Sequence, residues 1–205
     1  MKRQVKPTRA ELRDTKRRLS IVRQGHKLLQ RKQESLMVEL FKALEKFRKQ
    51  EQNTTSAHNV ATRNIAIAEM ISGRHATWGY AMTRAGTKAV DMKFSSYMGV
   101  RLPQYTMINT GGEAPFVPGE QPQSFDAAQA AEKLLENCIA LTEAEAVIST
   151  LVDEIERTKR RVNALELKVI PQLVEEATFI ISRLEEMERE SLFSLKRIRA
   201  KVCNR

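Results

Sequence analysis

The chain has 205 residues, of which 29% are charged and only 5% are aromatic, and its net charge is +10. This composition is typical of long coiled-coil helices, whose core is a narrow seam instead of one large centre. No run of about 18 uncharged apolar residues occurs, which excludes a membrane-spanning helix, and the polar N-terminus predicts no signal peptide.

The first predicted helix starts at Pro7 and Thr8 and runs to about residue 52 without another proline. Thr8 is placed to cap free backbone N–H groups, and Glu11, three residues later, would complete a capping box. Apolar residues recur in heptads along this helix, which predicts one side of a coiled-coil seam, and the polar His26 within it is interpreted as a residue that fixes register. The predicted seam residues here are Leu12, Leu19, Val22, Leu29, Leu36, Leu40 and Phe47.

Residues 51–56 are polar and weakly helical, which leaves two alternatives open: a break in the helix, or a solvated turn within a longer one. Helical spacing returns over Val60–Met82 and is interrupted by glycines, of which Gly73 is the first. Trp78 in this stretch is expected to lie in the core, as large aromatic side chains usually do.

In the middle of the chain the period changes to two, because apolar and polar residues alternate from about residue 90 to residue 105. This alternation predicts a short β-hairpin, and Pro103 would confine its second strand to an edge. The stretch 109–123 holds three prolines and three glycines and is expected to be an exposed loop.

A second long helix is predicted from Ser124 or Asp126 to the C-terminus, with apolar heptads of its own. Pro171 interrupts it, but no turn residues flank the proline and the apolar series resumes beyond it with a stutter. This favours one kinked helix over two. The predicted seam residues are Ile148, Leu151, Ile155, Val162, Leu165, Ile180, Leu184 and Met187.

Two such seams in one chain predict an antiparallel two-helix coiled coil. We therefore assign an all-α dominated fold in which the N- and C-terminal segments pair, with a shorter helix and a small hairpin between them. The expected domains are an N-terminal coiled-coil helix, residues 1–56; a middle region with helix, hairpin and loop, residues 57–123; and a C-terminal coiled-coil helix kinked near Pro171, residues 124–205.

Positive charge is concentrated at both ends of the chain: residues 1–50 carry 16 Lys and Arg against 5 Asp and Glu, and residues 187–205 carry 6 against 2. An antiparallel pair brings these ends together, so one tip of the helix pair is expected to be strongly basic. Such a tip is either a solvated face or a docking site for an acidic protein, a nucleic acid or a membrane surface.

Sequence patterns of catalysis are missing: the chain has no phosphate-binding loop, no Gly-x-Ser-x-Gly and no His-Glu-x-x-His. The histidines His26, His58 and His75 stand on different segments, without cysteine or acidic partners at ligand spacing. We therefore expect no catalytic residue, no cofactor and no metal site.

Several short segments, in order along the chain, carry a family likeness. The opening Pro7-Thr8-Arg9 and the sequence RRVNALE at 160–166 are distinctive, and more generic positions such as Gly25 and Phe193 accompany them. Together they resemble the D subunits of archaeal and bacterial A/V-type ATP synthases over essentially the whole chain. Leu167 departs from the family pattern, in which an aromatic residue is expected.

The resemblance implies a central rotor shaft that couples ATP synthesis or hydrolysis to proton or sodium translocation. Its tip would enter a ring of catalytic A and noncatalytic-site B subunits, the F subunit would bind its flank, and the C subunit would join its base, near the hairpin, to the membrane rotor ring. The chain would then lie peripherally on the cytoplasmic face of the cell membrane, without inserting into it. The tip residues that face the ring would be Lys2, Arg3, Lys6, Arg9, Arg13, Lys16, Arg17, Arg18, Arg197, Arg199, Lys201 and Arg205.

The main alternative is a basic coiled-coil protein that binds nucleic acid, and a further one is a structural scaffold in which two copies pair through their seams. Against direct nucleic-acid binding, the basic residues lack interleaved aromatics, and they are expected to spread around the first helix instead of forming one stripe.

Overall fold

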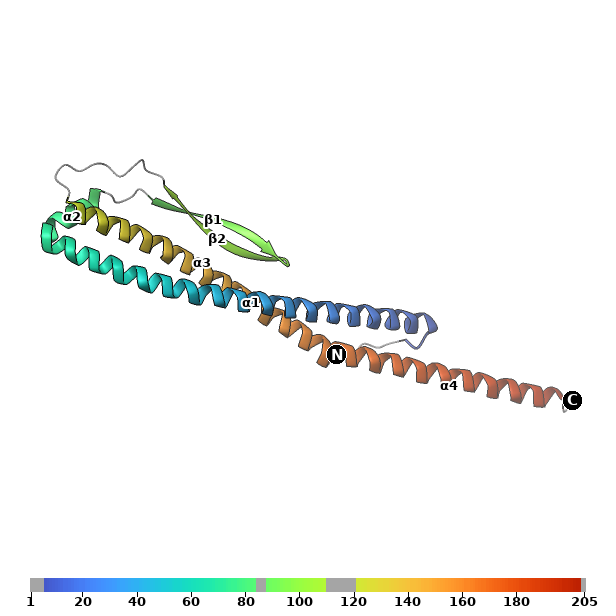
Figure 1. Ribbon diagram of the computed structural model, residues 1–205. Helices are drawn as coiled ribbons and strands as arrows, with labels where there is room; N and C mark the ends of the chain where they lie inside the picture. The colour runs from blue at the N-terminus through green and yellow to red at the C-terminus, as the bar shows by residue number, and fades with distance from the viewer. Residues whose placement is uncertain (1–5, 84–87, 110–120, 204–205) are drawn as a thin grey trace. The chain divides into compact units, whose positions relative to one another are not determined.

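Helices account for most of the structure, a computed structural model that describes residues 6–83, 88–109 and 121–203. They belong to two units: a terminal unit, Met1–Glu34 with Glu156–Arg205, and a middle unit, Ser35–Ile155. In chain order the elements are α1 (Arg9–Ser72), α2 (Arg74–Thr83), β1 (Lys88–Tyr97), β2 (Val100–Asn109), α3 (Pro122–Ala164), the π-helical turn η1 (Leu165–Val169) and α4 (Ile170–Cys203) (Figure 1).

Thr8 caps the start of α1, as the sequence predicts. Its Oγ1 accepts a hydrogen bond of 3.2 Å from the backbone N–H of Glu11. The N–H of Thr8 itself donates to the carbonyl of Lys6 at 2.9 Å, so the return bond of a capping box is not needed at this terminus.

Residues 51–56 form a turn within a longer helix, because α1 continues through them to Ser72. The weak helix formers stay helical by bonding back to the preceding turn: the hydroxyls of Thr54 and Thr55 donate to the carbonyls of Gln50 and Glu51 at 2.7 Å and 2.9 Å. The helix ends at Gly73, whose φ of +81° is the left-handed conformation that terminates many helices.

Each unit contains an antiparallel helix pair, which confirms the predicted fold class. In the terminal unit Arg9 of α1 pairs with Glu188 of α4 at 2.7 Å, while His26 lies near Glu166. In the middle unit Lys46 pairs with Glu143 at 3.5 Å. Partner numbers fall as residue numbers on α1 rise, so the chain returns along α1 in the opposite direction.

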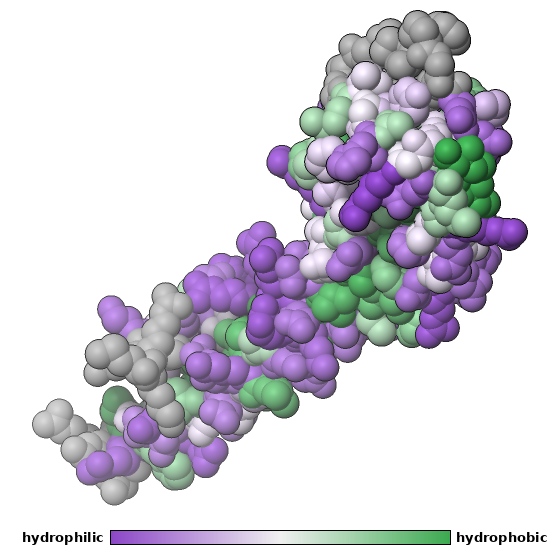
Figure 2. All heavy atoms as spheres, turned by 90° about the vertical axis from the view of Figure 1, so that its left-hand side faces the viewer, coloured by the Kyte–Doolittle hydropathy of each residue, from purple (hydrophilic) through white to green (hydrophobic). Residues whose placement is uncertain are grey.

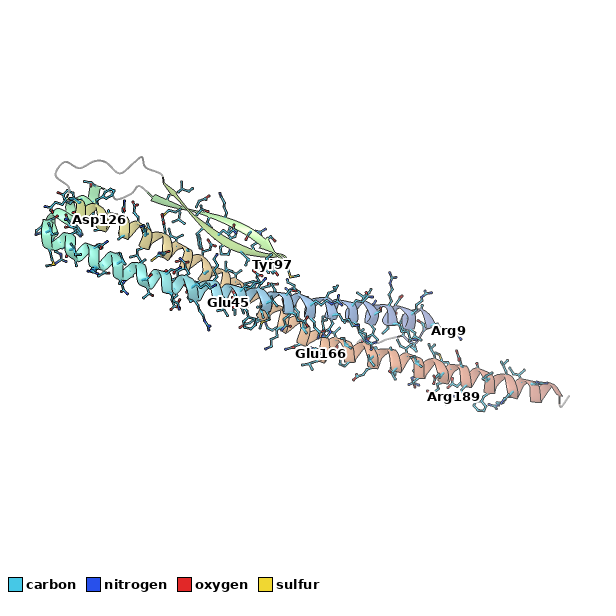
Figure 3. All side chains as sticks on the ribbon, in the orientation of Figure 1. Arg9, Glu45, Tyr97, Asp126, Glu166 and Arg189 are labelled. Carbon is cyan, nitrogen blue, oxygen red and sulfur yellow. The ribbon has the colours of Figure 1, made fainter. Side chains whose placement is uncertain are left out.

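The core of the middle unit joins the helix pair to the hairpin. Leu36 of α1 and Leu151 of α3 are fully buried and pack with Ile155 and with Val100 of β2. Tyr97, at the turn end of the hairpin, packs against the same cluster (Figure 3). The heptad positions therefore supply a core that also holds the hairpin against the helices.

β1 and β2 form the predicted hairpin, joined by the two-residue turn Met98-Gly99. Both turn residues have positive φ, 49° and 81°, which is the geometry of a type I′ turn. Pro103 pairs with Phe94. This is a position at which the backbone N–H of the strand would point away from its partner, so the proline removes no bond between the strands.

The second long helical segment begins two residues before the predicted start, at Pro122, because a proline fits the first helical turn. The backbone remains helical from Pro122 to Cys203. Just before Pro171, which has no N–H to donate, the ladder widens to a π-helical turn in which the N–H of Ile170 bonds to the carbonyl of Leu165. The stutter in the heptads coincides with this turn, and the kink itself stays a prediction.

Replacing Gly25 by Ala is expected to raise the free energy of unfolding by about 0.5–1 kcal/mol. Gly25 lies inside α1, and a Cβ atom added there meets no heavy atom within 4 Å. The glycine therefore serves no close approach of backbones, and alanine restricts the unfolded chain without a clash. Urea unfolding of both proteins measures the difference. A destabilised variant would contradict the open space that the structure places around Gly25.

Candidate docking surfaces

The predicted seam residues line the helix pairs. Leu36, Leu151, Ile155, Val162 and Ile180 are buried. Met187 is 44% exposed. The others are half-buried: Leu12, Leu19, Val22, Leu29, Leu40, Phe47, Ile148, Leu165 and Leu184.

The terminal unit has a thinner core than the middle unit. Its fully buried side chains are Ile180 and Thr158, and Thr15 is buried as well. The hydroxyl of Thr158 has no hydrogen-bond partner among the described residues. With Val162 and Ala177 these residues form a core that contains one large aliphatic side chain, so burial stabilises this helix pair only modestly.

His26 lies in the seam of the terminal unit, as its heptad position predicts. Its side chain is only 15% exposed, and its Nε2 atom is buried without a hydrogen bond among the described residues. The nearest carboxylate oxygen, Oε2 of Glu166, is 3.6 Å away and belongs to the π-helical turn η1. This geometry fits a polar register residue, since the described residues place no group of three His, Cys, Asp or Glu side chains there, as a metal site would need.

The basic residues expected at the tip are exposed wherever their side chains are described: Lys6, Arg9, Arg13, Lys16, Arg17, Arg18, Arg197 and Arg199. Both groups lie toward the same end of the terminal unit, with Arg197 and Arg199 of α4 beyond the start of α1. The side chains of Lys2, Arg3, Lys201 and Arg205 lie outside the described residues.

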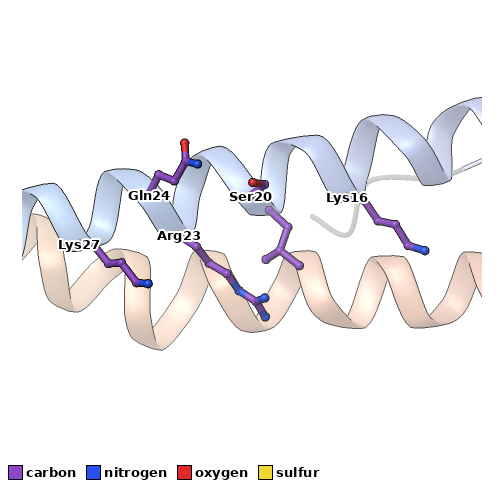
Figure 4. Close-up of a pocket in the computed structure, with 6 residues that line it drawn as sticks. Lys16, Ser20, Arg23, Gln24 and Lys27 are labelled. Carbon is purple, nitrogen blue, oxygen red and sulfur yellow. The ribbon is translucent and has the colours of Figure 1, made fainter.

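One subset of the basic residues forms a stripe along α1, whereas Arg17, Arg18 and Lys32 lie on other faces of the helix, so the basic residues as a whole still spread around it. Spacings of three, four and seven residues place them on one face. In Figure 4, Lys16, Arg23 and Lys27 project to the same side of α1, where they line a shallow hollow with Ser20 and Gln24. We call this set the basic stripe: Arg9, Arg13, Lys16, Arg23, Lys27 and Arg31.

The basic stripe is largely unneutralised. Arg9 pairs with Glu188, but the other five members make no ion pair within the part of the chain that the structure describes. Counting charges along the sequence shows the excess of positive charge but not that these six residues share one face. Their helical spacing indicates the shared face, provided that the helix is continuous from Arg9 to Arg31.

The end of α4 continues beyond the start of α1. Because Arg9, the first residue of α1, pairs with Glu188, the helical residues 189–203 have no α1 residue opposite them (Figure 3). We call this segment the overhang. Its apolar side chains are between 58% and 65% exposed, and sequence reasoning did not single them out as a docking surface: Leu192, Phe193, Leu195 and Ile198.

A second apolar surface lies in the middle unit, at the end of α1 and on α2. Trp78 is 67% exposed, so the expectation that it lies in the core is wrong. Met70 and Met82, which are 86% and 64% exposed, belong to the same segment, and α2 has no buried residue. Figure 2 shows hydrophobic side chains exposed in patches among hydrophilic ones on the face that it presents.

These exposed basic and apolar surfaces are suited to docking, whereas a metal site or a membrane-spanning helix would need other features. Over residues 6–83, 88–109 and 121–203, no three His, Cys, Asp or Glu side chains gather as a metal site would require. None of the helices in the same ranges is long and apolar enough to cross a membrane.

Comparison with known proteins assigns the chain to a family. The model of the family of ATP synthase D subunits matches residues 11–200. The D subunit of the A-type ATP synthase of Methanosarcina acetivorans is 38% identical over 206 residues, covering 98% of each chain. The proteins of the same name from Methanosarcina mazei and Thermococcus gammatolerans are 37% and 34% identical, covering 97% of this chain and 97% and 94% of theirs.

Proposed function

The chain belongs to the family of ATP synthase D subunits, and on that premise we propose that it is the central rotor shaft of an A/V-type ATP synthase. The shaft couples ATP synthesis or hydrolysis in a ring of catalytic A and noncatalytic-site B subunits to the translocation of protons or sodium ions. The observation that carries this proposal is the antiparallel pairing of α1 with the returning helices, together with the exposed basic and apolar side chains toward one end of the terminal unit.

A shaft of this kind works by contact and carries out no chemistry of its own. A ring of catalytic sites in different states responds to an asymmetric axle through differential binding, since a contact shifts an equilibrium only if it differs between the states. The basic stripe lies on one side of α1, so the surface it offers to a surrounding ring is asymmetric. The proposal therefore includes no catalytic residue and no cofactor in this chain.

The tip would face the A and B subunits. Its two groups of basic residues lie toward the same end of the terminal unit, and Arg197 and Arg199 belong to the overhang with its exposed apolar side chains. Acidic side chains on the inner wall of the ring would complement the basic stripe, and apolar ones would cover the overhang. This assignment retains the expected division into residues 1–56, 57–123 and 124–205, with the tip formed from the first and last.

Two further partners would contact the remaining surface. The F subunit would bind the flank of the helix pair, and the C subunit would join the base to the membrane rotor ring. The exposed Trp78, Met70 and Met82 support a protein contact in the middle unit, because aromatic residues and methionine are enriched in interfaces. Through these partners the chain would be held peripherally at the cytoplasmic face of the membrane.

Rotation tests the proposal directly. A visible probe is attached to Ser96→Cys, an exposed site on the hairpin, after Cys138→Ser and Cys203→Ser remove the native thiols. In complexes immobilised through the ring, ATP is expected to drive sustained rotation of the probe in one direction. A probe on one of the A subunits of the same complexes is the control and should stay fixed. Probes on Ser96→Cys that stay fixed while ATP is hydrolysed would overturn the shaft assignment.

One observation favours a second candidate, nucleic-acid binding: the basic stripe, whose spacing suits a row of phosphates. The rotor proposal predicts that the full chain binds duplex DNA only weakly and without sequence preference, as basic proteins in general do. A specific affinity that falls steeply with salt, and that falls further on substitution of Arg23 and Lys27, would favour the alternative.

A further inference from the structure

The outer edge of β1 is a sheet edge that the described part of the chain leaves open. The two-residue turn makes Tyr97 and Val100 a pair that exchanges both backbone hydrogen bonds, and such pairs alternate with pairs that exchange none. Val90, Met92 and Phe94 are therefore residues whose N–H and C=O groups point away from β2. Tyr105, which pairs with Met92, accordingly has an N–H that points away from β1.

The corresponding edge of β2 is covered by a helix. Tyr105 pairs with Met92, so its N–H points outward, and it donates to the Oε2 atom of Glu143 on α3 at 3.1 Å. Pro103, two residues away, is buried and needs no partner for an N–H. The hairpin thus places one edge on α3 and presents the other, that of β1, on its far side.

Devices that usually blunt an open edge are not found on β1. Between Ala89 and Tyr97 there is no proline, and the register with β2 contains no bulge. The lysine that could repel a neighbouring strand, Lys93, lies 3.7 Å from Asp91, which offsets its charge. The side chains on the outward positions are apolar, with Val90 54%, Met92 48% and Phe94 61% exposed.

We propose that β1 is a self-association edge, which pairs with β1 of a second copy of this chain to form a four-stranded sheet. A two-fold axis perpendicular to the sheet makes the two strands antiparallel and repeats every contact. This inference concerns the free chain and does not depend on the proposed function. It differs from pairing through the seams, because α1 fills its seam with α3 and α4 of the same chain.

Charge selects one register for the pair. Only the residues whose N–H and C=O groups point outward can exchange hydrogen bonds with the second copy. Two allowed registers of the β1–β1 pair therefore differ by two residues in the partner that each residue faces. With Met92 facing Met92 of the second copy, Asp91 faces Lys93 in both directions, and Val90 faces Phe94. One step either way instead places Asp91 opposite Asp91, or Lys93 opposite Lys93. Opposite charges across strands stabilise and like charges destabilise, so only the centred register is self-complementary.

A second copy is a better occupant than a strand of unspecified sequence, because the edge complements itself in charge and in apolar pattern. Long-range repulsion does not oppose the contact strongly. The middle unit carries 11 Lys and Arg against 14 Asp and Glu, so the positive charge of the chain resides in the other unit.

Charge reversal tests the register. The full chain is expected to show a concentration-dependent monomer–dimer equilibrium by sedimentation. Asp91→Lys or Lys93→Asp alone should weaken the dimer by about tenfold or more, because each places like charges opposite each other twice. The double variant should recover the dimer, and so should an equimolar mixture of the two single variants. Arg63→Asp, an exposed charge reversal on α1 of the same unit, is the matched control and should change nothing.

Cross-linking gives a second readout that does not depend on charge. In the chain without native cysteines, Met92→Cys lies on the two-fold axis, where facing Cα atoms of a bonded pair are about 5.5 Å apart and within disulfide range. Mild oxidation should yield a covalent dimer, whereas Met107→Cys, on β2, should not. A chain that stays monomeric throughout the micromolar range overturns the proposal. A dimer that is indifferent to Asp91 and Lys93, or that does not cross-link through Met92→Cys, overturns it as well.

Discussion

Replacing Leu151 by Asp is expected to lower the free energy of unfolding by about 4 kcal/mol or more. Leu151 is fully buried and packs with Leu36, Ile155 and Val100 in the cluster that joins the helix pair to the hairpin. Aspartate removes these apolar contacts and leaves a carboxylate with no cation in the cluster. The loss is a large part of the stability of an ordinary domain, which is about 5–15 kcal/mol. Thermal and urea unfolding, followed by circular dichroism, measure it.

The neighbouring Val152 supplies the control for this prediction. Val152 lies on the same helix and is 37% exposed, so Val152→Asp changes the sequence in the same way at the surface. Its effect should stay within about 0.5 kcal/mol. If Leu151→Asp unfolds like Val152→Asp, the seam assigned to α1 and α3 is not the core of the middle unit.

The seam was predictable because it depends on local spacing alone. Heptads place Leu36 and Leu151 on apolar stripes, and two stripes on one chain can be buried only against each other or against another copy. The structure shows that they pair within the chain. The hairpin was predictable for a similar reason, since the alternation from Val90 to Tyr105 has a period that no helix can use.

The stagger of the terminal helices was not predictable from the same pattern. Sliding one helix along the other by seven residues leaves every heptad position matched, so the spacing cannot decide which residue of α4 faces Arg9. In the structure Arg9 lies opposite Glu188, with their charged atoms 2.7 Å apart, and this pairing defines the register of α4 on α1. The overhang, with its exposed Phe193, depends on that register and could therefore not be predicted from the sequence.

Trp78 shows a second limit of reasoning from side-chain type. A large aromatic residue in a helical stretch is usually buried, but burial needs an opposing element. α2 is ten residues long and has no buried residue, so nothing in the described structure covers Trp78. Hydropathy alone does not distinguish an apolar residue of the core from an exposed apolar residue of an interaction surface.

Deleting residues 191–205 is expected to leave the isolated chain folded while strongly impairing coupling in the assembled complex. The overhang has no α1 residue opposite it, so its removal should change the free energy of unfolding by less than about 0.5 kcal/mol. If the overhang and its basic residues contact the catalytic ring differently in each state, their loss removes a coupling free energy of about 1–3 kcal/mol, or about 5- to 150-fold. ATP synthesis by reconstituted complexes, set against ATP hydrolysis by the same complexes, measures the coupling.

Two full-length variants separate the apolar from the charged contribution of the overhang. In one, Leu192, Phe193, Leu195 and Ile198 become serine; in the other, Arg197 and Arg199 become glutamine. Because these side chains are exposed, neither set should alter unfolding of the free chain. An apolar socket in the ring predicts that the serine variant resembles the deletion, whereas acidic ring residues predict that the glutamine variant does. Unimpaired synthesis with the deletion would contradict a role for the overhang in coupling, and a large drop in stability would mean that the overhang packs within the chain instead.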